Sequence, residues 1–154
     1  MQEITLREAT LDDIPTLLKF EQRVIEAERP YNSQLKEADI CYYDLNALIT
    51  ADNVALMIAE VGNLLIGSGY AEIRESKLCF LHDKHSYLGF MYVDSEFRGR
   101  GVNKILIDSL IQWSKERHVD QFHLDVYAEN QNAIRAYEKS GFKKDFINMS
   151  LSLD

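Results

Sequence analysis

Residues 93–107 read VDSEFRGRGVNKILI and join an apolar segment to an amphipathic one. The apolar run over residues 87–93 ends at Asp94, a short turn carries Arg98-Gly99-Arg100-Gly101, and helical periodicity follows. Glycine lets successive backbone N–H groups converge on one point without a Cβ in the way. The first turn of a helix adds unpaired N–H groups and the positive end of its dipole. This stretch therefore predicts a strand, a loop and a helix start that together hold an anion such as a pyrophosphate.

Three basic side chains, Arg98, Arg100 and Lys104, add positive charge beside this loop. An ordinary strand-to-helix connection with exposed basic residues is the alternative interpretation, and the segment alone does not decide between the two. A mononucleotide-binding half of the Rossmann type is disfavoured. Its G-x-G-x-x-G loop belongs early in a β-α-β unit, whereas this loop lies two-thirds along the chain and lacks the third glycine.

Length and charge set the broad class of the protein. We expect 154 residues to form a single domain over residues 1–154. The net charge of -8 argues against a broad nucleic-acid surface and fits a basic ligand such as an amine. No stretch approaches the length of a membrane span, and the charged N-terminus contains no apolar signal-peptide core. We therefore predict no nucleic-acid partner and no membrane.

Cysteine and histidine form no strong metal pattern. Cys41 and Cys79 lie far apart, which favours reduced thiols in a cytoplasmic protein. The spacing of His82 and His85 around Asp83 belongs to no metal signature, and no ligand cluster follows it. We predict solvated loop histidines and no metal, although one histidine could still approach a substrate.

Hydrophobic periodicity predicts the order of elements. A face of Gly67, Gly69 and Ala71 indicates that a helix or a ligand packs closely on one strand. The order predicts a mixed sheet with helices on both faces, an α/β or α+β sandwich. Strands are expected at residues 3–7, 54–61, 64–74, 87–93, 121–126 and 142–153, with helices up to about residue 27, over 40–49, after the glycine loop and over about 130–140.

Two motifs in this order resemble one family. The first is F-R-G-R-G-V-N over residues 97–103, and the second is L-D-V-Y-A-E-N-Q-N-A-I-R-A-Y-E-K-S-G-F over residues 124–142. Together they resemble the GNAT superfamily of acyl-CoA-dependent N-acyltransferases, whose motifs read Arg/Gln-x-x-Gly-x-Gly/Ala and then Asn, Ala-Ile, Tyr and Gly-Phe. The resemblance extends over essentially the whole chain. It implies a mixed, mostly antiparallel central sheet of six to seven strands flanked by helices on both faces.

The same resemblance implies an activity and a cofactor site. The activity is transfer of an acetyl group from acetyl-CoA to a primary amine of a small molecule or peptide, by direct attack in a ternary complex. Backbone groups of Met91, Tyr92 and Val93 would pair with the pantetheine, and a splay from residues 121–126 would admit the thioester. Asn130 and Ala133 would flank the pantetheine arm. The pyrophosphate would lie on Arg98, Gly99, Arg100, Gly101, Val102, Asn103 and Lys104.

Asn103 departs from the family motif, which has Gly or Ala at this position. Its side chain could crowd the pyrophosphate, or its amide could donate a further hydrogen bond, and we favour the second because the rest of the motif is intact. The site is expected to need no metal.

Acyl transfer to an amine needs a base, a polarised carbonyl and a proton for the leaving thiolate. Following the resemblance, Tyr137 is the expected acid at the sulfur, and a backbone N–H near Tyr92 or Val93 would polarise the carbonyl. Glu72, late in a neighbouring strand, is the expected base, with Glu75 and His85 as alternatives. Neither cysteine has a base spaced to activate it, so we expect no covalent intermediate.

Two features stay open on the sequence. A non-catalytic acyl-CoA-binding or regulatory module would keep the glycine loop without needing Tyr137 or a base. The acceptor site is expected from residues 30–49 and 75–86, and a homodimer is compatible with the chain.

Overall fold

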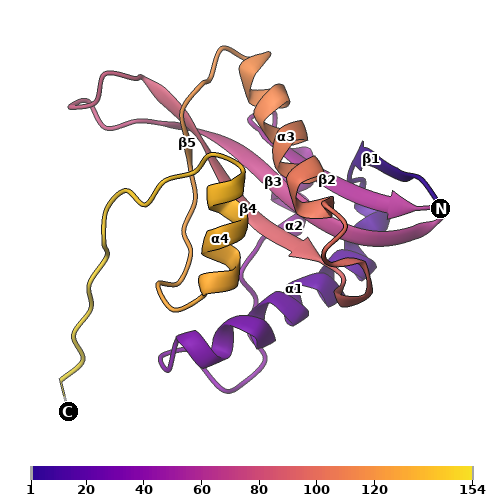
Figure 1. Cartoon of the computed structure of the whole chain (residues 1–154), viewed down its shortest axis with the longest axis horizontal. Helices are drawn as coiled ribbons and strands as arrows, with labels where there is room; N and C mark the ends of the chain where they lie inside the picture. Colours follow the sequence, from indigo (N-terminus) through magenta and orange to yellow (C-terminus); the bar gives the residue numbers. More distant parts are fainter. Residues whose placement is uncertain (1, 154) are drawn as a thin grey trace.

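A five-stranded sheet forms the centre of the computed structural model, which describes residues 2–153 (Figure 1). The strand order is β1-β2-β3-β4-β5; the first three pairings are antiparallel, and β4 and β5 are parallel. The predicted mixed, mostly antiparallel sheet is confirmed, but it has five strands rather than six to seven. The strands are β1 (Ile4–Glu8), β2 (Val54–Val61), β3 (Leu64–Glu75), β4 (Lys84–Val93) and β5 (Phe122–His123).

Helices cover both faces of the sheet, as predicted (Figure 1). On one face, Leu17 and Phe20 of the first helix share a core with Ile58 and Phe90 of the sheet. On the other face, Leu106 and Leu110 of the third helix pack on the opposite side of the strands. The helices are α1 (Ile14–Glu28), α2 (Leu45–Thr50), α3 (Val102–Lys115) and α4 (Gln131–Lys139), with short 3₁₀ turns η1 (Leu11–Asp13), η2 (Arg29–Tyr31) and η3 (Ser95–Phe97).

Two predicted elements are shorter than expected. The helix expected over residues 40–49 is confined to α2, because the buried Glu21 carboxylate accepts the backbone N–H groups of Tyr42 (2.9 Å) and Tyr43 (2.8 Å). These contacts fix an irregular segment, and Asp44 caps the helix by accepting from the Ala47 N–H at 3.1 Å. The strand expected over residues 121–126 is reduced to β5.

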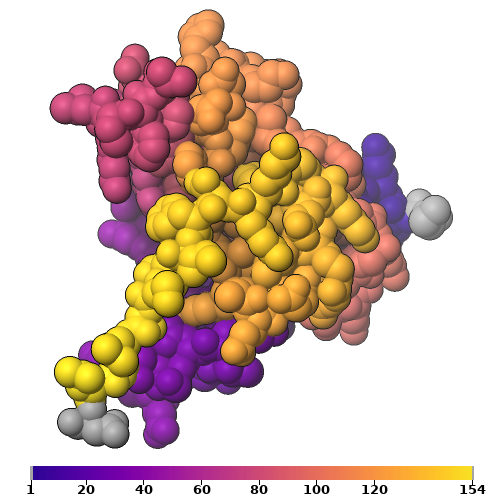
Figure 2. Space-filling model, turned by 60° about the vertical axis from the view of Figure 1, so that its left-hand side comes forward, coloured from indigo at the N-terminus to yellow at the C-terminus, as the bar shows by residue number. Residues whose placement is uncertain are grey.

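The C-terminal strand predicted over residues 142–153 does not form in this chain. Residues 143–153 belong to no helix or strand and take part in no hydrogen bond found in the described part of the chain. They project from the body as an extended arm (Figures 1 and 2). Alternation of apolar side chains predicted an extended conformation, but it does not supply an edge with which the segment can pair.

The close approach predicted on β3 is made by β4 and by α3. A Cβ on Gly67 would lie 2.8 Å from the Tyr92 carbonyl oxygen and 3.3 Å from a Leu106 methyl group. A Cβ on Gly69 would lie 2.5 Å from the Met91 sulfur. Glycine at these positions therefore leaves room on β3 for Tyr92 and Met91 of β4 and for α3, which begins at the glycine loop.

Candidate active site

Strands β4 and β5 separate after a short contact. They pair only at Ser86 with Phe122 and at Tyr87 with His123. Beyond Tyr87, β4 has no strand partner on this side among the described residues, which agrees with the splay that the family resemblance implies. Unpaired backbone N–H and C=O groups at such an edge can pair with an extended ligand. Met91, Tyr92 and Val93 lie in this part of the strand.

A bulge at Phe90 and Met91 disturbs β4 in this part of the strand. Ser68 lies opposite Tyr92, yet Tyr70 lies opposite Gly89, so β4 carries an extra residue between the two pairs. Phe90 takes a φ of +52°, and its carbonyl accepts a hydrogen bond from the buried Ser68 hydroxyl at 3.0 Å. A bulge leaves a residue out of the ladder and turns the local backbone. This is the kind of geometry that can aim a β4 N–H at a ligand carbonyl.

The glycine loop presents free backbone donors. Gly99 and Gly101 have φ angles of +77° and +79°, and Gly101 is the N-cap of α3. The first helical backbone bond runs from Ile105 N–H to the Gly101 oxygen at 3.1 Å. The N–H groups of residues 99–104 have no acceptor within residues 2–153. Nothing lies within 4 Å of a Cβ built on either glycine, so the loop borders open space. Unpartnered N–H groups at a helix start suit a pyrophosphate.

The basic side chains around the loop are held by exposed contacts. Arg98 Nε donates to the Val93 carbonyl at 3.2 Å, the Arg100 guanidinium lies 5.1 Å from the Phe97 ring, and Lys104 pairs with Asp108 at 2.7 Å. Exposed pairs of this kind are weak, so the cations can turn toward an anion. Asn103 is half-buried in the first turn of α3, and its side-chain amide makes no hydrogen bond with the described residues.

Helix α4 supplies Tyr137 and the second predicted motif. The Asn130 side-chain oxygen caps the helix by accepting from the Ala133 N–H at 3.3 Å, which leaves the Asn130 NH₂ group as the remaining donor. The Tyr137 ring packs against Phe142, with ring centroids 6.0 Å apart. Burial, with a smaller contribution from the Glu28 carboxylate, raises the pKa of Tyr137 to about 12. Tyr137 therefore keeps its proton at neutral pH.

Glu28, which the sequence analysis missed, is the last residue of α1, and its carboxylate is close enough to Tyr137 to contribute to the raised pKa of that hydroxyl. Burial raises its pKa, and the nearby Tyr42 hydroxyl partly opposes that rise. The Tyr42 hydroxyl is itself buried without a hydrogen-bond partner of ordinary geometry. The negative charge of Glu28 contributes to the raised pKa of Tyr43 as well as to that of Tyr137. Glu28 is therefore a half-buried carboxylate among tyrosines that come from distant parts of the chain.

The segment after α1 meets the segment between β5 and α4. Tyr31 stacks on Tyr127 with centroids 6.0 Å apart, and Asn32 donates to the Tyr127 hydroxyl at 2.9 Å. On β4, the Tyr87 hydroxyl donates to Asp125 at 3.0 Å. The Tyr31 and Asn32 contacts bring part of the predicted acceptor region, residues 30–49, against the segment that follows β5, and the Tyr87 contact ties that segment to β4.

The predicted base Glu72 lies opposite Tyr87 in the sheet. Its carboxylate is paired with the Arg74 guanidinium, which also lies 4.0 Å from the centroid of the Tyr87 ring. Glu72 thus lies beside the Tyr87–Asp125 pair, but its carboxylate already forms an ion pair with the Arg74 guanidinium.

The two alternative bases lie at the loop end of the β3–β4 hairpin. Glu75 is exposed and lies 3.9 Å from Lys84. His85 Nδ1 lies 2.9 Å from the Ser76 hydroxyl, which also contacts His82 Nδ1 at 2.7 Å. Burial and the neighbouring His123 and His82 lower the pKa of His85. Within residues 2–153, no three His, Cys, Asp or Glu side chains are placed to hold a metal ion, and no helix is long and apolar enough to cross a membrane.

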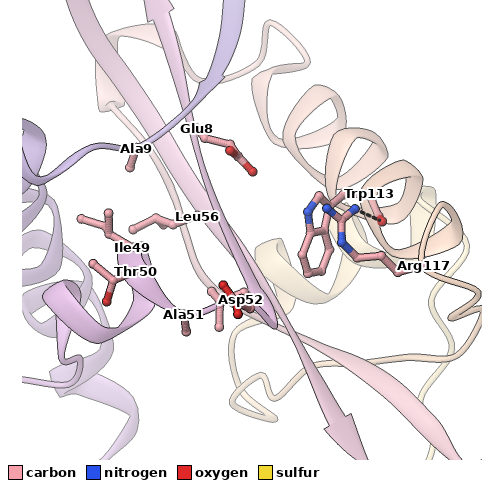
Figure 3. Close-up of a pocket in the computed structure, with 10 residues that line it drawn as sticks. Glu8, Ala9, Ile49, Thr50, Ala51, Asp52, Leu56, Trp113 and Arg117 are labelled. Atoms are coloured by element: carbon pink, nitrogen blue, oxygen red, sulfur yellow. Dashed lines mark hydrogen bonds between the residues drawn. The ribbon is translucent and has the colours of Figure 1, made fainter.

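A separate pocket of about 250 Å³ lies at the opposite end of α3 from the glycine loop (Figure 3). Trp113 and Arg117 form one wall, with the Arg117 guanidinium 4.2 Å from the Trp113 ring centroid, and Glu8 and Asp52 lie across from them. At about 1.5 Å per residue, the length of α3 places this pocket roughly 20 Å from the loop. We therefore do not assign it to the cofactor.

A family model described as Acetyltransferase (GNAT) family matches residues 18–142. An uncharacterised N-acetyltransferase of Methanocaldococcus jannaschii is 25% identical over 146 residues, covering 91% of this chain and 61% of its own length. The chain thus spans less than two-thirds of that relative. An N-alpha-acetyltransferase of Saccharolobus solfataricus is 25% identical over 149 residues, covering 93% of this chain and 82% of its own length.

Solved structures share the fold. A tetramutant of the BH1408 protein from Bacillus halodurans superposes with a TM-score of 0.86 at 21% identity, covering 97% of this chain and 99% of its own. A predicted acetyltransferase from Clostridium acetobutylicum, solved with acetyl-CoA, superposes with a TM-score of 0.78 at 21% identity, covering 97% and 96%.

Proposed function

The chain belongs to the acetyltransferase (GNAT) family, and from this premise we propose that it is an N-acetyltransferase that uses acetyl-CoA. The acceptor in this proposal is a primary amine of a small molecule or peptide. One observation carries the proposal: the unpartnered N–H groups of residues 99–104 lie directly after the open edge of β4. A loop of this kind suits a pyrophosphate, and an open strand edge suits the amides of a pantetheine arm.

In this proposal, acetyl-CoA supplies an activated thioester when bound. The β4 edge at Met91, Tyr92 and Val93 holds the pantetheine, and a β4 N–H near the bulge at Phe90 polarises the acyl carbonyl. The Asn130 NH₂ group donates to the pantetheine arm, beside Ala133. Tyr137 Oη, which stays protonated at neutral pH, donates its proton to the leaving sulfur.

We propose Glu28 as the base that takes a proton from the acceptor amine, with Glu72 as the alternative. Glu28 is half-buried, burial raises its pKa, and its charge contributes to the raised pKa of Tyr137. A general base works best when its pKa lies near the working pH, so the raised value favours Glu28. Glu72 shares the region of Tyr87 and Asp125, but its pairing with Arg74 competes with an incoming ammonium group.

The surroundings of this base favour a cationic acceptor. Glu28 and Asp125 bring negative charge, and tyrosine rings from residues 31–43 and 127 can lie against an ammonium group. The net charge of -8 also favours the approach of a positively charged acceptor. Polyamines, amino sugars and peptide N-termini all fit this description.

Calorimetric titration with coenzyme A, followed by a panel of amines with acetyl-CoA and detection of released thiol, tests the proposal. We expect saturable 1:1 binding and thiol release with at least one cationic amine. Binding without release across the whole panel would favour the non-catalytic acyl-CoA-binding module. Absence of coenzyme A binding would overturn both functions.

A Gly101→Val variant is expected to weaken coenzyme A binding about tenfold or more, since a left-handed φ costs a residue with a Cβ roughly 1–2 kcal/mol. The strain would move the N–H groups that face the pyrophosphate. Gly62→Val is the matched control, because Gly62 also has a positive φ of +59° and open space, but lies in the β2–β3 turn. It should lower the melting temperature without changing the dissociation constant. Equal affinity losses in both variants would argue against the loop assignment.

A further inference from the structure

Glu21 is a fully buried carboxylate that the proposed reaction does not use. The residue is 0% exposed, and it forms no ion pair within residues 2–153. One oxygen, Oε2, accepts the Tyr42 and Tyr43 backbone N–H groups, whereas Oε1 has no partner. Burying a carboxylate without a cation is costly, so an apolar side chain of similar size would often be more stable. The carboxylate therefore points to a role other than stability.

The segment that this carboxylate holds has no secondary structure of its own. Residues 36–43 belong to no helix or strand and turn back along α1 (Figure 1). Within the described chain, every hydrogen bond found on their backbone is made with a side chain of α1 or with Arg29 beside it. The Arg29 and Gln22 side chains donate to backbone carbonyls of the segment. Side chains at and just after α1 therefore set the path of this segment.

Glu21 makes the buried contacts of this set. The hydrogen bonds of Arg29 and Gln22 are exposed, so water competes with them. The two N–H groups at Glu21 donate to a charged acceptor that is removed from water, at 2.9 and 2.8 Å. Loss of that acceptor would leave two partly buried N–H groups unpaired, which is the costly case. The position of residues 42–43 therefore depends on this carboxylate.

Tyr42 and Tyr43 reach two parts of the proposed active site. Burial raises the pKa of both Glu28 and Tyr42, the Tyr42 hydroxyl lowers that of Glu28, and Glu28 raises that of Tyr42. The Tyr43 ring packs on Phe90 of the β4 bulge, with ring centroids 4.6 Å apart. Glu21 and Glu28 are seven residues apart, which places them about two turns apart on the same face of α1. One short stretch of chain therefore connects the buried carboxylate to the proposed base and to the bulge.

We infer that Glu21 is a positioning residue, which holds residues 42–43 so that the Tyr42 hydroxyl stays beside the Glu28 carboxylate. This role rests on the proposed function of Glu28 as the base. Glu21 takes no part in the proton transfer itself and acts on where the acceptor amine and the base meet. Loosening the segment should therefore raise the KM for the amine. Coenzyme A binding should stay the same, because residues 98–104 make no hydrogen bond with residues 36–43 in the described chain.

Kinetics of two Glu21 variants test the inference. Glu21→Leu removes both acceptor oxygens, and we expect the KM for the amine to rise about tenfold or more while the coenzyme A dissociation constant stays within about twofold. Glu21→Gln is the matched rescue, because its carbonyl oxygen can accept both N–H groups and its NH₂ group takes the place of Oε1, which has no partner. Its KM should stay within about threefold of the wild type. Equal losses in the two variants, or an unchanged KM in Glu21→Leu, would overturn the inference.

The pH profile distinguishes positioning from a general loss of stability. An opened segment exposes Glu28, so the acidic limb of kcat/KM in Glu21→Leu should move to lower pH, toward the ordinary glutamate pKa of about 4.3. Ile58→Val is the control, since it removes one methyl group from the buried core that α1 shares with the sheet. It should lower the melting temperature without changing the KM or the limb. A raised KM in Ile58→Val, or an unshifted limb in Glu21→Leu, would contradict the positioning role.

Amide exchange tests the contact without turnover. In the wild type, the Tyr42 and Tyr43 N–H groups should exchange about tenfold or more slowly than those of residues 36–39, which have no acceptor within the described chain. Equal exchange rates would overturn the inference even if Glu21→Leu does not fold. Two protected amides in a wild type that releases no thiol with any amine would instead reject the proposed function, and the positioning role with it, while the contact itself is retained.

Discussion

Replacing Tyr137 by phenylalanine is expected to lower kcat about 100-fold, the scale of a single general acid, while coenzyme A affinity stays nearly unchanged. The ring of Tyr137 packs against Phe142, and phenylalanine keeps that packing. The substitution removes only the hydroxyl, which has no hydrogen-bond partner within the described chain. Folding stability should therefore change little, and the loss should appear in the chemical step.

Single-turnover thiol release and calorimetry with coenzyme A measure the two quantities separately. Because the pKa of Tyr137 is raised to about 12, its hydroxyl remains protonated across the assay range, and the variant should have the same pH dependence as the wild type at lower rate. An unchanged kcat would assign the proton donor elsewhere. Weaker coenzyme A binding at unchanged kcat would give Tyr137 a packing role only.

Local chemistry made the glycine loop predictable from sequence. Gly99 and Gly101 take the positive φ angles that glycine permits at low cost, and α3 begins directly after them. The apolar run before the loop is β4, and Gly67 and Gly69 mark the close approach of α3. Each of these features depends on residues adjacent in the sequence or on the repeat of residue types along a single strand or helix. A single sequence is therefore sufficient to predict it.

Tertiary pairing was not predictable in the same way. The alternation in residues 143–153 describes an extended chain equally well whether it lies in a sheet or leaves the body as an arm. The helix expected over residues 40–49 was too long, because the Glu21 carboxylate accepts hydrogen bonds from the backbone N–H groups of Tyr42 and Tyr43. Glu21 lies in the middle of α1, about 20 residues earlier in the sequence. No periodicity within residues 40–49 contains that contact.

The identity of the general base also could not be predicted from the sequence, because it depends on tertiary contacts. Glu72 is visible as a carboxylate late in a strand next to β4, but its pairing with Arg74 follows from the side-chain positions in the folded sheet. Glu28 reads as the polar last residue of an amphipathic helix, just before Arg29-Pro30 ends that helix. Only folding brings it near Tyr42 and Tyr137. The available signal was its place at the start of a tyrosine-rich segment, which does not distinguish a base from a solvated carboxylate.

A Glu28→Gln variant is expected to lower kcat/KM at neutral pH about 100-fold, because glutamine cannot accept the amine proton. Glutamine keeps the size of the side chain, so the packing at the end of α1 should be retained. Glu72→Gln is the matched variant, with the same atom exchange in a carboxylate already paired with Arg74, and we expect it to cost much less.

The pH profile carries the sharper test. A base must be deprotonated, so kcat/KM should fall as the pH drops through the pKa of Glu28. Burial raises that pKa, so the acidic limb should lie above the value of about 4.3 for an ordinary glutamate. Glu28→Gln should abolish this limb, whereas Glu72→Gln should retain it. If Glu72→Gln instead removes the acidic limb and causes the larger loss of kcat/KM, Glu72 is the base and the half-buried carboxylate of Glu28 only shapes the acceptor site.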